Sequence, residues 1–141
     1  MSEAVDKSAP RVRPKFRNLE LSQIATYRLP VPGIVSILHR ISGALMFVVG
    51  IPFILYLLQQ SISSEISFDH YRSLVSHWFT KLVLLALIWS YLHHFCAGIR
   101  FLFLDLHIGI EKPAARSSAG IVLIVSLVLT AIVALKLFGV F

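Results

Sequence analysis

Three long apolar segments dominate the pattern of hydrophobic and polar residues along this chain. They cover about residues 33–58, 77–106 and 117–137, with only scattered charges near their ends. Their uncharged centres approach the length of about 18–20 residues that crosses a bilayer as a helix. Pro52 lies inside the first segment and predicts a kink, which neighbouring membrane helices can tolerate. We therefore expect an all-α membrane protein with three transmembrane helices.

The residues before the first apolar segment have a different character. Residues 1–32 are polar, basic and interrupted by prolines. They lack the short apolar core of a signal peptide, and they contain Glu3 and Asp6, which organellar transit peptides tend to avoid. We interpret 1–32 as a basic cytoplasmic tail with a short interfacial helix at about 19–26. A three-helix transmembrane anchor, 33–141, follows it.

The charges in the connections predict the orientation. The connection at 59–76 carries more acidic than basic residues, whereas the connection at 107–116 carries Lys112 and Arg116. Basic residues concentrate on the cytoplasmic side of membrane proteins. The N-terminus and the second connection are therefore expected in the cytoplasm, and the C-terminus in the periplasm. Because three spans alone leave polar side chains without partners, we expect this chain to join a heteromeric helix bundle.

The connections themselves are expected to be solvated. Glu65 and Asp69 are interpreted as parts of a serine-rich loop. His70, His77 and His107 lie in or beside connections and are expected to face water.

Composition supports a membrane protein and excludes other classes. Hydrophobic residues make up 57% of the chain and charged residues 14%, far from the average of a soluble domain. The net charge of +6 is concentrated before the first apolar segment, and no nucleic-acid module accompanies it. Nucleic acid is therefore not an expected partner. The single cysteine, Cys96, has no intrachain partner and is expected to be a packing residue.

Polar residues at the start of the first segment form one candidate site. Ser36, Arg40 and Gly43 recur at helical spacing and share a face, with His39 beside it. A lone arginine at this depth can snorkel to lipid phosphates, but snorkelling does not explain the adjoining hydroxyl and imidazole. A guanidinium here is suited to bind a carboxylate, such as a haem propionate, or to hold a quinone oxygen.

Two adjacent histidines in the second segment form another candidate site. His93 and His94 are about 100° apart around a helix, so spacing alone does not choose between them. His94 shares its face with Gly98, where a macrocycle or another helix can approach closely, and His93 shares its face with Arg100. A histidine at membrane depth serves either as a metal ligand or in an interhelical hydrogen bond. Zinc is a poor match, because no three or four nitrogen or sulfur ligands gather at one depth.

Taken in order, these motifs resemble one known family. The matching stretches are Arg13-Pro14, Arg28-Leu-Pro, Ser36-Ile-Leu-His-Arg-Ile-Ser-Gly43 and His94-(three residues)-Gly98-Ile-Arg100-(four residues)-Asp105. They resemble the cytochrome b556 subunits of succinate dehydrogenase, the larger membrane anchors of complex II. The resemblance extends over nearly the whole chain. Because residues 1–32 do not show a transit-peptide pattern, we expect a bacterial member of the family, located in the inner (cytoplasmic) membrane.

The resemblance implies a shared haem b site. Aligned through the Gly98-Ile-Arg100 stretch, His94 occupies the position of an axial ligand of the haem iron, and His93 does not. The second axial histidine is expected from the small membrane-anchor subunit. His39 and Arg40 resemble the residues that meet the haem propionates. Phe101 stands where many members of the family have a histidine.

The resemblance also implies a quinone site and a role in electron relay. Ser36 and Arg40 match positions that bind ubiquinone, and Ile37 lines that pocket. In the family, the flavoprotein subunit oxidises succinate and the iron–sulfur subunit passes electrons to ubiquinone near the cytoplasmic face. This chain is expected to bind both subunits and the lipid bilayer, and to carry no dehydrogenase chemistry of its own.

Alternatives remain open. A fumarate reductase-type anchor would serve the opposite direction of turnover, which a sequence does not reveal. A haem-free structural anchor or assembly adaptor would use its histidines only to bridge helices. A transporter subunit is disfavoured, because Pro52 is thin support for the broken helices that such proteins use.

Overall fold

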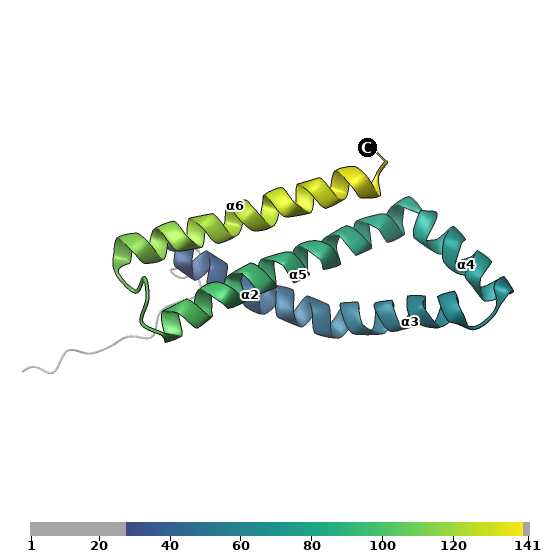
Figure 1. Ribbon diagram of the computed structural model, residues 1–141, viewed down its shortest axis with the longest axis horizontal. Helices are drawn as coiled ribbons and strands as arrows, with labels where there is room; N and C mark the ends of the chain where they lie inside the picture. Colours follow the sequence, from purple (N-terminus) through teal and green to yellow (C-terminus); the bar gives the residue numbers. More distant parts are fainter. Residues whose placement is uncertain (1–27, 140–141) are drawn as a thin grey trace, which may run out of the picture.

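The computed structural model describes residues 28–139, and this part of the chain is helical (Figure 1). Residues 1–27, including the interfacial helix expected at 19–26, lie outside the described residues. In chain order the elements are α2 (Val31–Leu45), a π-helical turn η1 (Met46–Gly50), α3 (Ile51–Ile62), α4 (Glu65–Ser76), α5 (Trp78–Asp105) and α6 (Lys112–Leu137).

Three helical stretches in the described part are long and apolar enough to cross a membrane. They are Val31–Ile62, which joins α2, η1 and α3, then Trp78–Asp105 and Lys112–Leu137. The predicted all-α class with three spans is therefore confirmed. The start of α2 lies at the same end of the molecule as the α5–α6 connection, and α4 lies at the other end (Figure 1).

Three basic residues that flank the spans gather at one end. Arg28, Lys112 and Arg116 all line a cavity of about 700 Å³ between the start of α2 and the start of α6. The described end of the basic N-terminal segment therefore lies beside the α5–α6 connection, which is compatible with both being on one side of a membrane.

The irregularity expected at Pro52 takes the form of a π-helical turn. Proline has no backbone N–H, and its ring would clash with the carbonyl of Val48, four residues earlier. The wider turn at Met46–Gly50, immediately before α3, accommodates this clash without ending the helix. Gly50 is buried there, and a Cβ at this position would lie 3.3 Å from Cδ2 of Leu87. The first span thus contacts α5 closely at its irregular turn.

The expectation of a loop at Glu65 and Asp69 is wrong, because both residues belong to α4. Ser64 begins this helix with a reciprocal cap: its hydroxyl accepts a hydrogen bond from the Ser67 N–H, and the Ser67 hydroxyl accepts one from the Ser64 N–H. A serine thus takes the place of the Glu or Gln that usually completes this cap. Both acidic residues are exposed on the helix.

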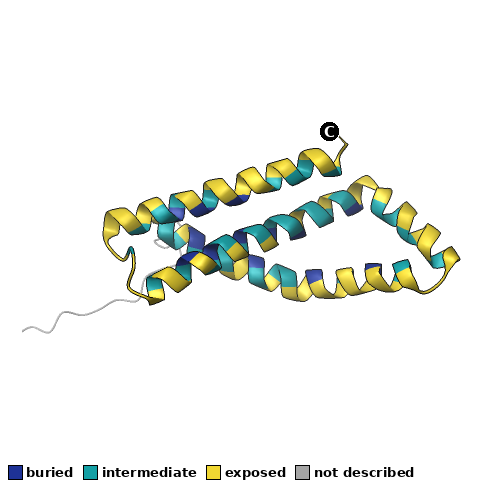
Figure 2. Ribbon diagram, in the orientation of Figure 1, coloured by how far each residue is buried: buried dark blue, intermediate teal, exposed yellow. Residues whose placement is uncertain are grey.

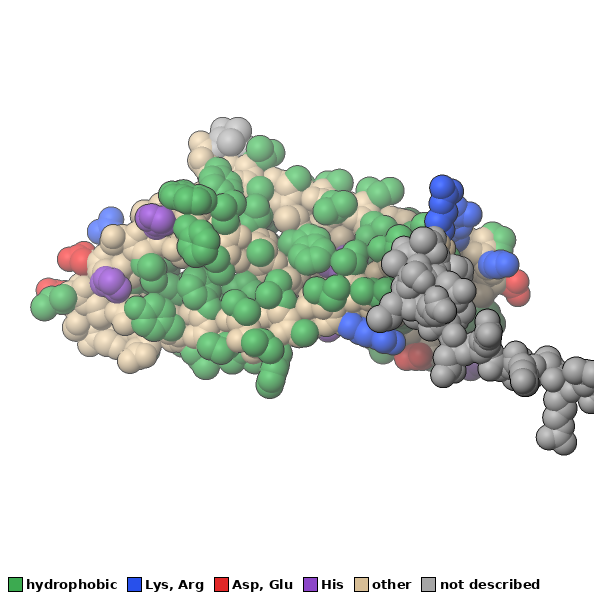
Figure 3. Space-filling model, turned by 180° about the vertical axis from the view of Figure 1, so that it is seen from behind, with side chains coloured by type: hydrophobic (Ala, Val, Ile, Leu, Met, Phe, Trp, Pro, Cys, Tyr) green, Lys and Arg blue, Asp and Glu red, His purple; other side chains and the backbone are tan. Residues whose placement is uncertain are grey.

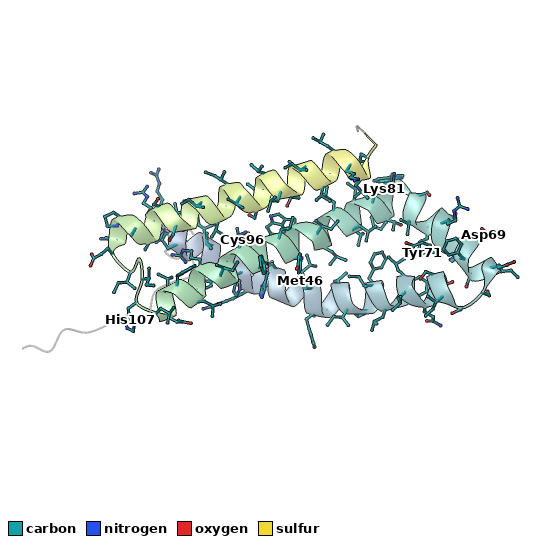
Figure 4. All side chains as sticks on the ribbon, viewed as in Figure 1. Met46, Asp69, Tyr71, Lys81, Cys96 and His107 are labelled. Atoms are coloured by element: carbon teal, nitrogen blue, oxygen red, sulfur yellow. The ribbon has the colours of Figure 1, made fainter. Side chains whose placement is uncertain are left out.

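The three remaining histidines are exposed, as expected. His70 lies on α4, and His77 caps α5 by accepting a hydrogen bond from the Phe79 N–H at 3.3 Å. His107 follows α5 with a positive φ of 60° and lies in the α5–α6 connection (Figure 4).

The core lies where α2, α5 and α6 meet. Val35, Ala97, Ala119 and Val122 form its buried cluster, and their small side chains let the three helices approach closely. Buried residues follow the inner faces of the helices, whereas the outer faces are largely exposed (Figure 2). Hydrophobic side chains cover the middle of the outer surface, and charged ones lie toward its ends (Figure 3). This distribution fits a surface that contacts lipid or other membrane helices.

Candidate functional site

The two polar motifs predicted from the sequence meet where α2 packs on α5. The imidazole rings of His39 and His94 stack with their centroids 3.9 Å apart and their planes 12° from parallel. Phe101 also lies beside His39, with ring centroids 5.1 Å apart and planes tilted by 60°. Residues more than fifty positions apart in the chain thus form one aromatic cluster.

Hydrogen bonds fix the orientation of His94. Its Nδ1 lies 3.0 Å from the backbone carbonyl oxygen of His39 and 3.3 Å from Oγ of Ser42. A carbonyl oxygen only accepts hydrogen bonds, so this network assigns the proton to Nδ1. The Ser42 hydroxyl donates to the same carbonyl at 2.9 Å. The lone pair of the neutral ring is therefore on Nε2 of His94, the arrangement found in metal-ligating histidines whose other nitrogen is held by a backbone carbonyl.

Gly43 provides the space that His94 occupies. A Cβ at Gly43 would lie 2.9 Å from Cε1 and 3.3 Å from Nδ1 of His94, closer than side-chain atoms normally pack. Gly98, which the sequence suggested as the point of close approach, is less constrained, because a Cβ there would make an ordinary contact of 3.8 Å with Nε2 of His39. Within this chain, the close approach depends on Gly43.

Ser42 was not identified from the sequence as a partner of His94. It is fully buried between the helices. The signal in the sequence was the small Ser-Gly pair that follows His39, but a Ser-Gly pair is also common in plain helix packing. Only the position of α5 reveals that both residues contact one imidazole.

The residues predicted to bind quinone lie on the outer side of α2. Ser36 is half-buried, Ile37 is 42% exposed and Arg40 is exposed. Within residues 28–139, no Asp or Glu pairs with the Arg40 guanidinium. Residues 28–139 leave these three side chains at least partly uncovered, so that a ligand or a partner can reach them.

His93 lies in a different environment from His94. It is fully buried, its Nδ1 is 3.3 Å from Oγ of Ser126 on α6, and its ring stacks on Trp89. Because the Ser126 hydroxyl donates to the carbonyl of Leu123, His93 must donate from Nδ1. Nε2 of His93 is buried without a hydrogen-bond partner among the described residues. This nitrogen is therefore enclosed within the helix bundle and is not open to a ligand in this arrangement.

Arg100 joins α5 to α6 on the same face as His93. Its Nε donates to Oγ of Ser118 at 3.0 Å, and one Nη donates to the carbonyl of Ala115 at 3.2 Å. Only 6% of this residue is exposed. Its hydrogen bonds thus go to α6 and not to His39 or His94, although its guanidinium carbon lies 5.5 Å from the ring centroid of Phe101.

No multi-ligand metal site accompanies these residues. In the described part of the chain, no three His, Cys, Asp or Glu side chains gather closely enough to hold a metal ion. Among the described residues, His39 and His94 are stacked face to face and so do not point their ring nitrogens at one common position, as two ligands of one metal ion would.

Comparison with known proteins identifies the family. The family profile described as "Succinate dehydrogenase/Fumarate reductase transmembrane subunit" matches residues 13–133. The chain belongs to this family. The resemblance noted in the sequence is thereby confirmed, and the matched range includes the SILHRISG motif of α2 and the histidine motif of α5.

Several curated members of the succinate dehydrogenase/fumarate reductase transmembrane subunit family are similar to this chain over most of their length. The relative from Coxiella burnetii is 37% identical over 113 residues, which cover 79% of this chain and 86% of the relative. The relative from Paracoccus denitrificans is 34% identical over 118 residues, covering 84% and 89%. The relative from Rickettsia prowazekii is 34% identical over 108 residues, covering 76% and 82%. All three are named succinate dehydrogenase cytochrome b556 subunit.

Proposed function

We propose that this chain is the haem b-binding and quinone-site membrane anchor of a succinate:ubiquinone oxidoreductase in a bacterial inner membrane. The observation that carries this proposal is the orientation of His94. Its Nδ1–H is held by the His39 carbonyl, so Nε2 is free to bind iron. The names of the curated relatives, which specify a cytochrome b556, support the same assignment.

The residues of the cluster are suited to hold haem b. His94 would be one axial ligand of its iron, and the small membrane-anchor subunit would supply the other. His39 and Arg40, at the same helical turn of α2, would meet the propionates, and Arg40 has no carboxylate partner among the described residues. When bound, the haem would supply a one-electron carrier within the membrane. Within this chain, Ser42 and Gly43 hold His94 in place.

Ser36, Ile37 and Arg40 would bind ubiquinone. A quinone is an apolar ring with carbonyl oxygens that accept hydrogen bonds. The guanidinium of Arg40 and the hydroxyl of Ser36 lie on one side of α2 and can donate to such an oxygen, while Ile37 presents an apolar wall. The flavoprotein and iron–sulfur subunits would oxidise succinate and deliver the electrons, with the basic end of this chain in the cytoplasm and its C-terminus in the periplasm.

The first experiment is to purify the complex through a tag on this chain. We expect the flavoprotein and iron–sulfur subunits to copurify, and the dithionite-reduced minus oxidised spectrum to show a haem b band. A haem-free anchor would copurify with the same subunits and show no band. Failure to copurify with a flavoprotein would contradict the assignment to complex II. Comparing succinate oxidation with fumarate reduction in the same preparation would separate the two directions of turnover.

Gly43→Ala is expected to weaken haem binding by about tenfold, at the low end of the loss that follows when a ligand loses its supporting partner. The new Cβ would lie 2.9 Å from Cε1 of His94, so the imidazole must shift and lengthen its bond to the His39 carbonyl. The measurement is haem per flavin in the purified complex as it is washed with a haem-binding competitor. Gly120→Ala is the matched control, because a Cβ at Gly120 on α6 meets nothing within 4 Å. Equal haem retention in both variants would contradict the supporting role of Gly43.

A further inference from the structure

A groove between α5 and α6 lies apart from the residues assigned to haem and quinone. Its volume is about 560 Å³, within the range of about 300–1,000 Å³ typical of small-molecule sites. Cys96, Ile99 and Phe103 of α5 form one wall, and Ile121 and Val125 of α6 form the other. The groove is not lined by any of the residues assigned to haem or quinone, which are Ser36, Ile37, His39, Arg40 and His94.

The groove contains a buried positive charge. Arg100 lines it and is only 6% exposed. Its two hydrogen bonds, to Ser118 and to the carbonyl of Ala115, go to uncharged acceptors and use two of its five N–H groups. Among residues 28–139, no Asp or Glu forms an ion pair with it. The Phe101 ring, whose centroid lies 5.5 Å from the guanidinium carbon, offers a cation–π contact but no negative charge. Because a charge in a membrane span is costly unless an opposite charge pairs with it, we expect Arg100 to bind an anion from outside the described residues.

The polarity of the groove changes along its length. Arg100 lies five residues before the end of α5, about 7.5 Å along the helix axis. Ser117 and Ser118 line the same end, near the start of α6, and Lys112 is the first residue of that helix. Farther from this end, the lining is apolar on both helices, through Cys96 and Val125. One end thus suits an anionic group at the membrane interface, and the other suits hydrocarbon.

We propose that this groove binds one anionic phospholipid. The phosphate is held by Arg100 and the Ser117 hydroxyl, and one acyl chain lies between α5 and α6. A phosphodiester is the anion that is abundant at this depth, and guanidinium groups bind phosphate with charge-assisted hydrogen bonds. A neutral quinone would leave the charge of Arg100 unpaired.

The test counts the lipids that remain on the purified complex by native mass spectrometry. Complexes are exchanged into phosphatidylglycerol or into phosphatidylcholine with the same acyl chains. The wild type is expected to retain one phosphatidylglycerol that phosphatidylcholine replaces poorly. Arg100→Gln is expected to bind phosphatidylglycerol about tenfold more weakly, which corresponds to a loss of about 1.4 kcal/mol of binding free energy. Lys136→Gln, a loss of one positive charge near the opposite end of α6, is the control and should bind as the wild type does.

A second pair of variants keeps the test decisive if Arg100→Gln does not assemble. Ile121→Trp fills the groove without removing any hydrogen bond, whereas Ile124→Trp adds the same bulk on an exposed part of α6 outside the groove. Loss of the retained lipid only in Ile121→Trp supports the proposal. Equal retention in both variants overturns it, and so does a wild type without a retained lipid, which would indicate that a partner subunit covers Arg100. None of these outcomes depends on a haem band, so the lipid site and the proposed redox role are tested separately.

Discussion

His94→Ala is expected to abolish the haem b band of the purified complex, whereas His93→Ala is expected to retain it. His94 has its Nδ1–H bound to the His39 carbonyl and its Nε2 free, while His93 is enclosed between helices and bonded to Ser126. Under the proposed ligation, His94→Ala would remove a bond to the iron, whereas His93→Ala would leave that bond intact. The measurement is the dithionite-reduced minus oxidised spectrum, normalised to flavin.

The normalisation matters because His93→Ala leaves a cavity in the bundle. Large-to-small substitutions in a core commonly cost about 2–5 kcal/mol, so the yield of assembled complex is expected to fall. His93→Gln retains a donor for Ser126 and should recover part of that yield. A haem band that is lost in His93→Ala and kept in His94→Ala would show that the ligand assignment is wrong by one residue.

Arg40→Gln is expected to lower kcat/KM for ubiquinone reduction by about tenfold to a hundredfold. A hydrogen bond from a charged donor contributes about 1.5–3 kcal/mol, and each 1.36 kcal/mol corresponds to a tenfold change in rate. Succinate oxidation with a soluble artificial acceptor should be unchanged, because those electrons leave before they reach the membrane. Both activities are measured on the same preparation.

Arg116→Gln is the matched control for this prediction. Arg116 is also an exposed arginine, near the start of α6 at the same end of the molecule, and it does not belong to the proposed quinone site. If Arg40 only reaches toward lipid phosphates, both variants should reduce ubiquinone as fast as the wild type. That result would remove Arg40 from the quinone site.

The polar connection between the first and second spans shows where the hydrophobic pattern failed to predict the structure. Apolar length identified the three spans, because crossing hydrocarbon imposes a minimum number of uncharged residues. No such constraint applies to α4, whose serines and acidic residues look like a loop. Its cap is made by Ser64 and Ser67, and its Phe68 and Tyr71 rings pack 5.8 Å apart. Both features depend on local geometry that composition does not encode.

The two histidines show a different limit. Their angular separation followed from helix geometry, but their roles did not, since each faced an unknown neighbour. The packing of α6 on one face enclosed His93, and the packing of α2 on the next face oriented His94. Arg100 is a similar case, because its hydrogen bonds go to Ser118 and Ala115 of α6 and not to His39 or His94.

The number of spans, their helical type and the residues worth testing thus followed from the chain alone, because hydrophobic length and helical spacing are local properties. The family resemblance added candidate roles for those residues. Only the folded structure revealed three further features: the support of His94 by Ser42 and Gly43, the enclosure of His93, and the groove lined by Arg100. Each of these features depends on contacts between different helices, and such contacts exist only once α2, α5 and α6 pack together.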